Sequence, residues 1–195
     1  MTTPELGLRE QILVAAKRLF IEQGYHGLAM RQISEAVGVS KAALYYHFKD
    51  KEELFLAILS SNLDEIEQAI DLIQAKQISY KEEIILFVKY VLEQPAEHRA
   101  IIRLASQEMS QLSAASRKKF DKTYHEQFTG KLQAIFQAGV ESGEFRPLDP
   151  AIATWALLGM MYPYFYPAHT GPTPVRPETI RQIISIYMNG VIKSD

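Results

Sequence analysis

Residues 37–55, VGVSKAALYYHFKDKEELF, constrain the fold more strongly than any other stretch of this sequence. Gly38 follows an apolar helix end and can adopt the left-handed backbone of a tight turn. Ser40 is suited to cap the helix that follows, and Asp50 with Glu53 has the spacing of a capping box for the next one. The stretch therefore predicts two helices joined by a short turn and followed by a third.

The middle helix of this stretch, residues 41–48, has two different faces. Leu44 and Phe48 lie one turn apart and are expected to face inward. The remaining positions carry short, polar or aromatic side chains: Lys41, Ala42, Ala43, Tyr45, Tyr46 and His47. Two helices joined by a short turn are typical of a helix-turn-helix, whose second helix enters the major groove of DNA. The alanines are short enough to let this helix approach base edges in that groove, whose width admits one α-helix.

Apolar residues recur at helical spacing along the rest of the chain. The pattern predicts helices over 9–23, 30–37, 51–70, 80–94, 96–109, 116–142, 150–166 and 178–192. Gly24, Pro95 and Gly143 are expected to end three of them. No strand-like alternation or internal repeat competes, so the predicted fold class is all-α.

Composition limits the function without identifying it. The chain has 195 residues, a formal net charge of −2 and no cysteine, which excludes disulfides and thiolate metal sites. No apolar run reaches the roughly 20 residues that span a bilayer, and the N-terminus lacks the features of a secretory signal. We therefore expect a cytoplasmic protein with no membrane partner, no metal and no cofactor. The net charge gives no reason to expect binding to nucleic acid, so a prediction of DNA binding must be based on the placement of basic side chains and not on their number.

Two sequence segments together are similar to the TetR family of transcriptional regulators. They are AAKRLFIEQGYHGL, residues 15–28, and ISEAVGVSKAALYYHFKDKEELF, residues 33–55. The resemblance implies a three-helix helix-turn-helix DNA-binding domain over 1–50 and a helical effector-binding and dimerisation domain over 51–195. It also implies DNA contacts at Arg31, Ser40, Lys41, Ala42, Ala43, Tyr45, Tyr46, His47 and Lys51.

The chemistry of these side chains predicts which part of the DNA each one contacts. Lys41 and Ala42 are expected to meet base edges, whereas Tyr45, His47 and Lys51, on the rim of the helix, are expected to donate to phosphates. The segment Leu28-Ala29-Met30 departs from the family, which usually has threonine or serine opening the second helix. Loss of that cap costs about 1 kcal/mol and removes one expected phosphate contact.

Beyond residue 70 the resemblance is one of size and helix order. Members of the family often hold an apolar pocket there, and we expect its lining at Phe87, Tyr90, Val91, Ile102, Ser106, Met109, Phe128, Leu132, Trp155 and Met160. Candidate polar contacts are His98, Arg103, Glu108 and His125, although a surface or capping role is the favoured interpretation of each. The family pairs through its last two helices, which predicts a homodimer seam at Ala153, Ala156, Gly159, Ile183, Ile184 and Tyr187.

The leading hypothesis is a repressor that binds a palindromic operator in double-stranded DNA and is released by a small hydrophobic effector. One alternative is a small helical enzyme acting on a hydrophobic substrate in the same cavity, although no catalytic set or metal-ligand spacing is evident. Another is an architectural DNA-binding protein without a ligand. The length of chain beyond the DNA-binding helices argues against it, since DNA binding needs only the first ~55 residues plus a dimer contact.

Overall fold

The computed structural model describes residues 7–166 and 174–192, and these residues are almost entirely helical. The elements are α1 (Leu8–Gly27), α2 (Met30–Val37), α3 (Lys41–His47), α4 (Lys51–Gln74), α5 (Tyr80–Glu93), α6 (Ala96–Glu108), η1 (Met109–Gln111), α7 (Ala114–Tyr124), η2 (His125–Thr129), α8 (Gly130–Glu141), α9 (Pro150–Met161), η3 (Tyr162–Phe165) and α11 (Pro177–Val191). The all-α prediction is confirmed.

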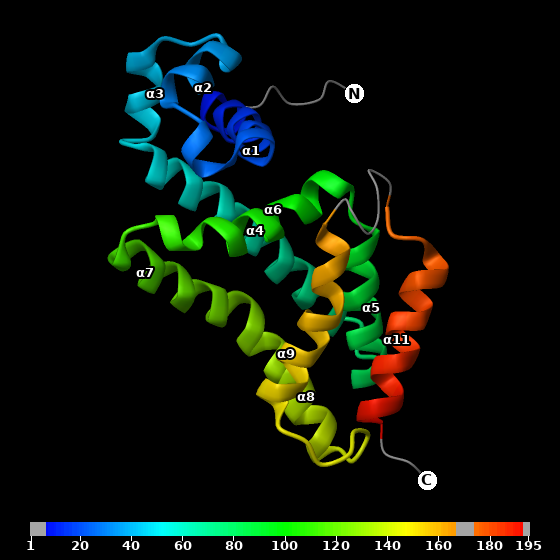
Figure 1. Ribbon diagram of the computed structural model, residues 1–195. Coiled ribbons are helices and arrows are strands. Elements are labelled where there is room, and N and C mark those ends of the chain that lie inside the picture. The colour runs from blue at the N-terminus through cyan, green and yellow to red at the C-terminus, as the bar shows by residue number, and fades with distance from the viewer. Residues whose placement is uncertain (1–6, 167–173, 193–195) are drawn as a thin grey trace.

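Helices α1, α2 and α3 form a small N-terminal unit at one end of the molecule (Figure 1). Its centre is aromatic, with the ring of Phe20 5.1 Å from that of Phe55 and the ring of Tyr25 5.2 Å from that of Phe55. Gly24 breaks α1 as predicted, because its φ of 71° is left-handed, and one further turn follows it. Phe55 belongs to the start of α4, so α4 completes the interior of this unit, which is continuous with the core of the rest of the molecule.

Helix α4 connects this unit to the rest of the molecule (Figure 1). It begins at Lys51 and runs through Gln74, four residues beyond the predicted end. Its buried residues follow one face along its whole length, from Leu54 beside the N-terminal unit to Ile73 among the C-terminal helices. One rigid element thus belongs to both parts of the structure.

The C-terminal bundle consists of α5 to α11. Phe136 and Phe145 are fully buried in it, with ring centres 5.7 Å apart. This packing requires Gly139, since a Cβ at that position would lie 2.3 Å from the Cδ2 atom of Phe145. Within the described parts of the chain, no helix has the length and apolar character needed to cross a bilayer.

Two predicted helices are interrupted. The single helix predicted over 116–142 is instead α7 and α8 joined by the π-helical turn η2, where Gly130 is needed because a Cβ would lie 2.8 Å from the carbonyl oxygen of His125. The helix predicted over 150–166 ends at Met161 and continues as the 3₁₀ turn η3, which contains Pro163. Residues 167–173 lie outside the described residues.

Candidate DNA-binding surface and ligand cavity

Helix α3 is fixed by its caps and by two buried anchors. Leu44 and Phe48 are buried as predicted, and Gly38 adopts the left-handed conformation with φ 75°. The Ser40 hydroxyl accepts a hydrogen bond from the Ala43 amide at 3.1 Å. Such local bonds orient a helix of only seven residues, which could not be stable alone.

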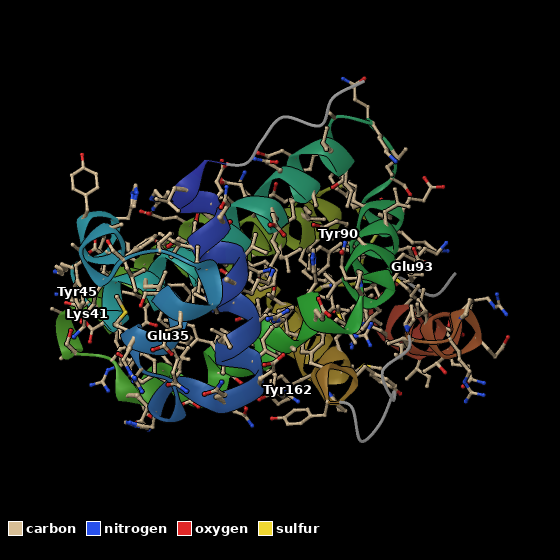
Figure 2. All side chains as sticks on the ribbon, turned by 90° about the horizontal axis from the view of Figure 1, so that it is seen from above. Glu35, Lys41, Tyr45, Tyr90, Glu93 and Tyr162 are labelled. Carbon is tan, nitrogen blue, oxygen red and sulfur yellow. The ribbon has the colours of Figure 1, made fainter. Side chains whose placement is uncertain are left out.

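The outward face of α3 presents the predicted side chains to solvent. Lys41, Ala42, Tyr45 and Tyr46 are exposed, and Tyr46 retains 86% of its accessible surface. Figure 2 shows Lys41 and Tyr45 together at the outer edge of the molecule. Two exposed tyrosines beside a lysine and an alanine leave this face of α3 free to contact a partner surface.

The other predicted DNA contacts differ in their surroundings. Ala43 and His47 are half-buried, and the His47 ring meets the Tyr46 ring edge-on at 5.3 Å. Arg31 is exposed on α2 and pairs with Glu35 at 3.3 Å. Because that ion pair is exposed, it is weak and leaves the guanidinium able to exchange partners.

Lys51, at the start of α4, uses two of the three donors of its ammonium within the chain, so its predicted contact with phosphate stays a prediction for the third. Its ammonium donates hydrogen bonds to the carbonyl oxygens of Tyr25, at 2.6 Å, and Leu28, at 2.9 Å. It also lies 4.5 Å from the centre of the Tyr25 ring. Burial lowers the pKa of Lys51, and Glu108 partly offsets this effect. Lys51 therefore closes the end of α1, satisfying carbonyls that the helix leaves unpaired.

The missing cap of α2 is replaced in part by a residue that sequence reasoning overlooked. Ala29 occupies the cap position and has no side-chain acceptor, as expected. The Gln32 side chain instead accepts a hydrogen bond from the Ala29 amide at 2.8 Å. A glutamine three residues after the cap is half of a capping box, and this spacing was the signal available in the sequence.

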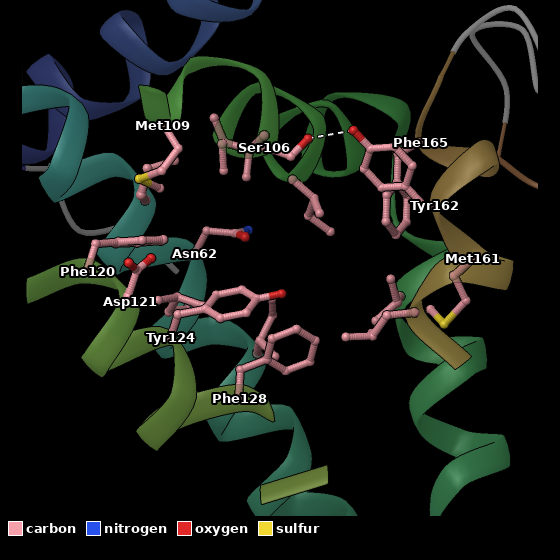
Figure 3. Close-up of a pocket in the computed structure, with 18 of the residues that line it drawn as sticks. Asn62, Ser106, Met109, Phe120, Asp121, Tyr124, Phe128, Met161, Tyr162 and Phe165 are labelled. Carbon is pink, nitrogen blue, oxygen red and sulfur yellow. Dashed lines mark hydrogen bonds between the residues drawn. The ribbon is translucent and has the colours of Figure 1, made fainter. Parts of the chain in front are cut away.

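A mostly apolar cavity of about 390 Å³ lies among α4, α5, α6, α7 and α9. Figure 3 shows Phe120, Asp121, Tyr124 and Phe128 on one side of it, facing Ser106, Tyr162 and Phe165. The predicted residues that line it are Phe87, Val91, Ile102, Ser106, Met109, Phe128 and Trp155. The volume suits a small organic molecule.

Three predicted lining residues lie elsewhere. Leu132 is fully buried in the packed core, and Met160 gives way to Met161, the next residue of α9. Tyr90 lies beside a separate, much smaller pocket, where its hydroxyl donates to the Glu65 carbonyl oxygen at 3.4 Å. A helical stripe includes both core and cavity positions, so periodicity alone did not separate them.

The polar groups of the cavity differ from those predicted. The cavity is lined by Asn62, Asp121, Tyr124 and Tyr162, and Ser106 and Tyr162 share a hydrogen bond of 2.6 Å between their hydroxyls. Burial raises the pKa of Tyr124 to about 12. Tyr124 belongs to the apolar stripe read in the sequence, but nothing there signalled that its hydroxyl faces an open space.

None of the four predicted polar contacts is among the described residues that line this cavity. The Arg103 guanidinium lies over the Tyr166 ring at 5.7 Å, and His125 bonds Thr129 at 3.2 Å. Glu108 accepts a hydrogen bond from the Tyr25 amide at 3.3 Å. His98 lies beside the smaller pocket.

The corner formed by the end of α6, η1 and the start of α7 joins the cavity to the N-terminal unit. Glu52 of α4 accepts hydrogen bonds from the Ser113 amide at 3.1 Å, from the Ser113 hydroxyl at 2.7 Å and from the Ser116 hydroxyl. These bonds, the one from Ser116 first, lower the pKa of the Glu52 carboxyl. The His26 ring meets the Gln111 side chain at 2.6 Å. This corner, residues 108–116, also contributes Met109 to the cavity wall.

The predicted dimer seam is wrong at three positions. Ala153, Ile183 and Tyr187 are buried within the chain, and the Tyr187 hydroxyl donates to the Ala153 carbonyl oxygen at 2.7 Å. The exposed stripe of α9 is instead Ile152, Trp155, Ala156 and Gly159. On α11, Ile186 is 68% exposed.

Comparison with known proteins agrees with a helix-turn-helix unit followed by a helical C-terminal bundle. Residues 12–58 match the model for bacterial regulatory proteins of the tetR family, and residues 77–164 match that for the tetracyclin repressor-like C-terminal domain. The structure of PfmR, a TetR family transcriptional regulator from Thermus thermophilus, is 31% identical with a TM-score of 0.76 and covers 91% of this chain and 97% of that one.

Two further relatives show how the similarity is distributed. The uncharacterized HTH-type transcriptional regulator YhgD of Bacillus subtilis is 23% identical over 92% of this chain and 94% of its own length. The HTH-type transcriptional repressor AcnR of Corynebacterium diphtheriae is 48% identical, but only over 30% of this chain and 31% of its own. The strongest local similarity is therefore confined to a short segment, whereas PfmR matches along almost the whole length. On this evidence the chain belongs to the TetR family of DNA-binding transcriptional regulators.

Proposed function

We propose that this protein is a ligand-responsive repressor that binds a palindromic operator as a homodimer and is released by a small hydrophobic effector. One observation carries the proposal: the corner at residues 108–116 contacts the N-terminal unit and also contributes to the wall of the apolar cavity. A ligand that displaces this wall changes the support of the DNA-binding helices. We also propose that the protein acts in the cytoplasm, where its operator is.

DNA binding uses the exposed face of α3. Ala42 approaches base edges, Lys41 reaches guanine acceptors or a phosphate, and Tyr45 donates to phosphate. Ser40 already accepts a bond from the Ala43 amide, and its hydroxyl proton stays available to a phosphate oxygen. Arg31 exchanges its exposed pairing with Glu35 for a phosphate.

Dimerisation uses the last two helices. The exposed stripe of α9 presents Ile152, 70% exposed, beside the small residues Ala156 and Gly159, which allow a second helix to approach closely. Ile186 adds an apolar side chain from α11. A two-fold axis through this surface presents the two α3 helices to two identical half-sites.

The switch acts through two connections. Helix α4 is shared by the N-terminal unit and the bundle, and Glu52 near its start is held by Ser113 and Ser116. A ligand that moves α6 or α7 therefore tilts the N-terminal unit. Half-sites lie about 34 Å apart, so a shift of a few ångströms in the spacing of the two α3 helices prevents simultaneous docking.

The repressor assignment is supported by AcnR, which is similar in the N-terminal segment and is named a repressor. Among the described residues that line the cavity, the Ser106 hydroxyl is paired with the Tyr162 hydroxyl and no histidine or lysine is present to activate it, which favours ligand binding over covalent catalysis there.

The test is operator binding by the purified protein. A duplex selected from a random library is titrated by fluorescence anisotropy over a series of salt concentrations, and the mass of the complex is measured by light scattering. We expect a palindromic consensus, two subunits per duplex and a steep loss of affinity with salt. A monomer on a single half-site, or binding indifferent to salt, would contradict the proposal.

A further inference from the structure

We infer that the effector is a hydrophobic organic cation whose charged end lies beside Asp121. The inference rests on the proposed function, because it names the class of ligand taken by the same cavity. It comes from the charge and the shape of the side chains that line the cavity.

Within the described parts of the chain, the cavity wall carries a negative charge with no positive one to balance it. Asp121 is the one lining residue there with a charged side chain. Its carboxylate forms no hydrogen bond or ion pair with the other described residues. Arg103 of α6 is not part of the lining, and its guanidinium lies over the ring of Tyr166. An incoming cation therefore meets a carboxylate that has no competing partner among these residues.

Aromatic rings surround the same end of the cavity. Figure 3 shows Phe120 and Tyr124 on either side of Asp121, with Phe128 farther along the same wall. The rings of Tyr124 and Phe128 meet edge-on with centres 5.2 Å apart, and the face of an aromatic ring attracts a cation. The Tyr124 phenol is neutral at pH 7, as any tyrosine is, so it adds no second negative charge.

An anionic ligand is disfavoured by the same groups. A carboxylate or phosphate placed beside Asp121, which is exposed to solvent, would find no lysine, arginine or histidine in the described part of the wall and would face a like charge. Neutral apolar molecules are accommodated by the aliphatic part of the lining, without any contribution from Asp121. The ligand classes are therefore expected to bind in the order cation, neutral molecule, anion.

The test compares three probes with the same chain length: decyltrimethylammonium, decanol and decanoate. Trp155 is the only tryptophan of the chain; it lines the cavity but is also 55% exposed on the α9 stripe, so a change in its emission is assigned to the cavity when light scattering shows an unchanged oligomeric state. We expect the ammonium probe to bind at least about tenfold more tightly than decanoate, with decanol between them, because only the cation is attracted by both the carboxylate and the rings.

Two variants separate the local charge from the net charge. Asp121→Asn keeps the shape and removes the charge, and should reduce the preference for the ammonium probe over decanoate to less than about threefold, because the Coulomb attraction is lost. Glu126→Gln removes a neighbouring charge that pairs with Lys122 and does not line the cavity, and should leave the preference unchanged.

Each remaining outcome counts against a specific claim. Tighter binding of decanoate, or an unchanged preference in Asp121→Asn, would overturn the inference about ligand class. No response of Trp155 to any probe would overturn it as well. If the ammonium probe binds as expected but operator affinity stays the same, the ligand class stands and the proposed function fails.

Discussion

The N-terminal unit and the C-terminal bundle use their apolar residues in opposite ways. In the unit, Phe20, Tyr25 and Phe55 fill the interior, while Tyr45 and Tyr46 remain on the surface. In the bundle, aromatic residues such as Phe120 and Phe128 surround a space of about 390 Å³ that they do not fill. Open space forfeits packing energy that a filled core would gain. A rigid unit that presents one surface is thus joined to a bundle that keeps room for a ligand.

The largest expected effect is on the surface of the N-terminal unit. Ala42→Glu should weaken operator binding more than about 100-fold, because it introduces bulk and negative charge where α3 approaches the bases. Stability should be preserved, since Ala42 is exposed in the first turn of α3, where an acidic residue is favourable. Anisotropy titration and thermal unfolding measure the two quantities.

Val14→Glu is the matched control, because it adds the same charge to an exposed position of α1. If both variants lose operator binding equally, net charge explains the loss and α3 is not the reading helix.

The packed part of the bundle should be the next most sensitive. Gly139→Ala places a Cβ 2.3 Å from Phe145 and should lower the free energy of unfolding by about 1–3 kcal/mol. Gly190→Ala, where an added Cβ meets nothing within 4 Å, should be neutral or stabilising by up to about 1 kcal/mol. Chemical denaturation compares the two variants. Equal changes in the free energy of unfolding in the two variants would show that contact with Phe145 does not set the cost at position 139.

A variant of Lys51 tests whether this side chain stabilises the N-terminal unit or contacts DNA. Lys51→Met should lower the free energy of unfolding by about 1–2 kcal/mol, because two carbonyl oxygens lose a charged donor. The slope of log affinity against log salt should not change, whereas loss of a phosphate contact would reduce it by about 1. A reduced slope with unchanged stability would instead identify Lys51 as a phosphate ligand.

The smallest effect concerns Glu52, which joins α4 to α7. Its pKa is lowered in the folded protein, so its contribution to stability is present above the ordinary glutamate value of 4.5 and is lost as the pH falls through the lower folded-state value. Glu52→Gln should therefore cost less than about 1 kcal/mol at pH 7, with the difference from the parent disappearing in acid. Urea denaturation at several pH values measures it, with Glu22→Gln on exposed α1 as control. A difference that grows in acid would contradict the bonds to Ser113 and Ser116.

The two regions also differ in how far the sequence predicts them. In the N-terminal unit, Gly38, Ser40 and Leu44 act on neighbours within a few residues, so the turn, the cap and the anchor of α3 followed from local rules. The bonds of Lys51 within the chain were not predictable by local rules, because its acceptors, on Tyr25 and Leu28, lie 26 and 23 positions away in the sequence.

In the bundle, the helices were predictable but the space between them was not. Leu132 and Phe128 share a helical stripe and both are buried, yet only Phe128 lines the cavity. The polar groups Asn62 and Asp121 come from α4 and α7. Only the packing of these two distant helices brings them to the same cavity.

Reciprocal linkage between the cavity and the DNA is the most direct test of the account. The affinity of decyltrimethylammonium is measured through Trp155 emission, first with the free protein and then with saturating operator. We predict that operator weakens probe binding by about 5- to 150-fold, the coupling of 1–3 kcal/mol typical of such switches. Equal affinity in the two titrations would mean that the cavity and α3 are independent, and would contradict the account.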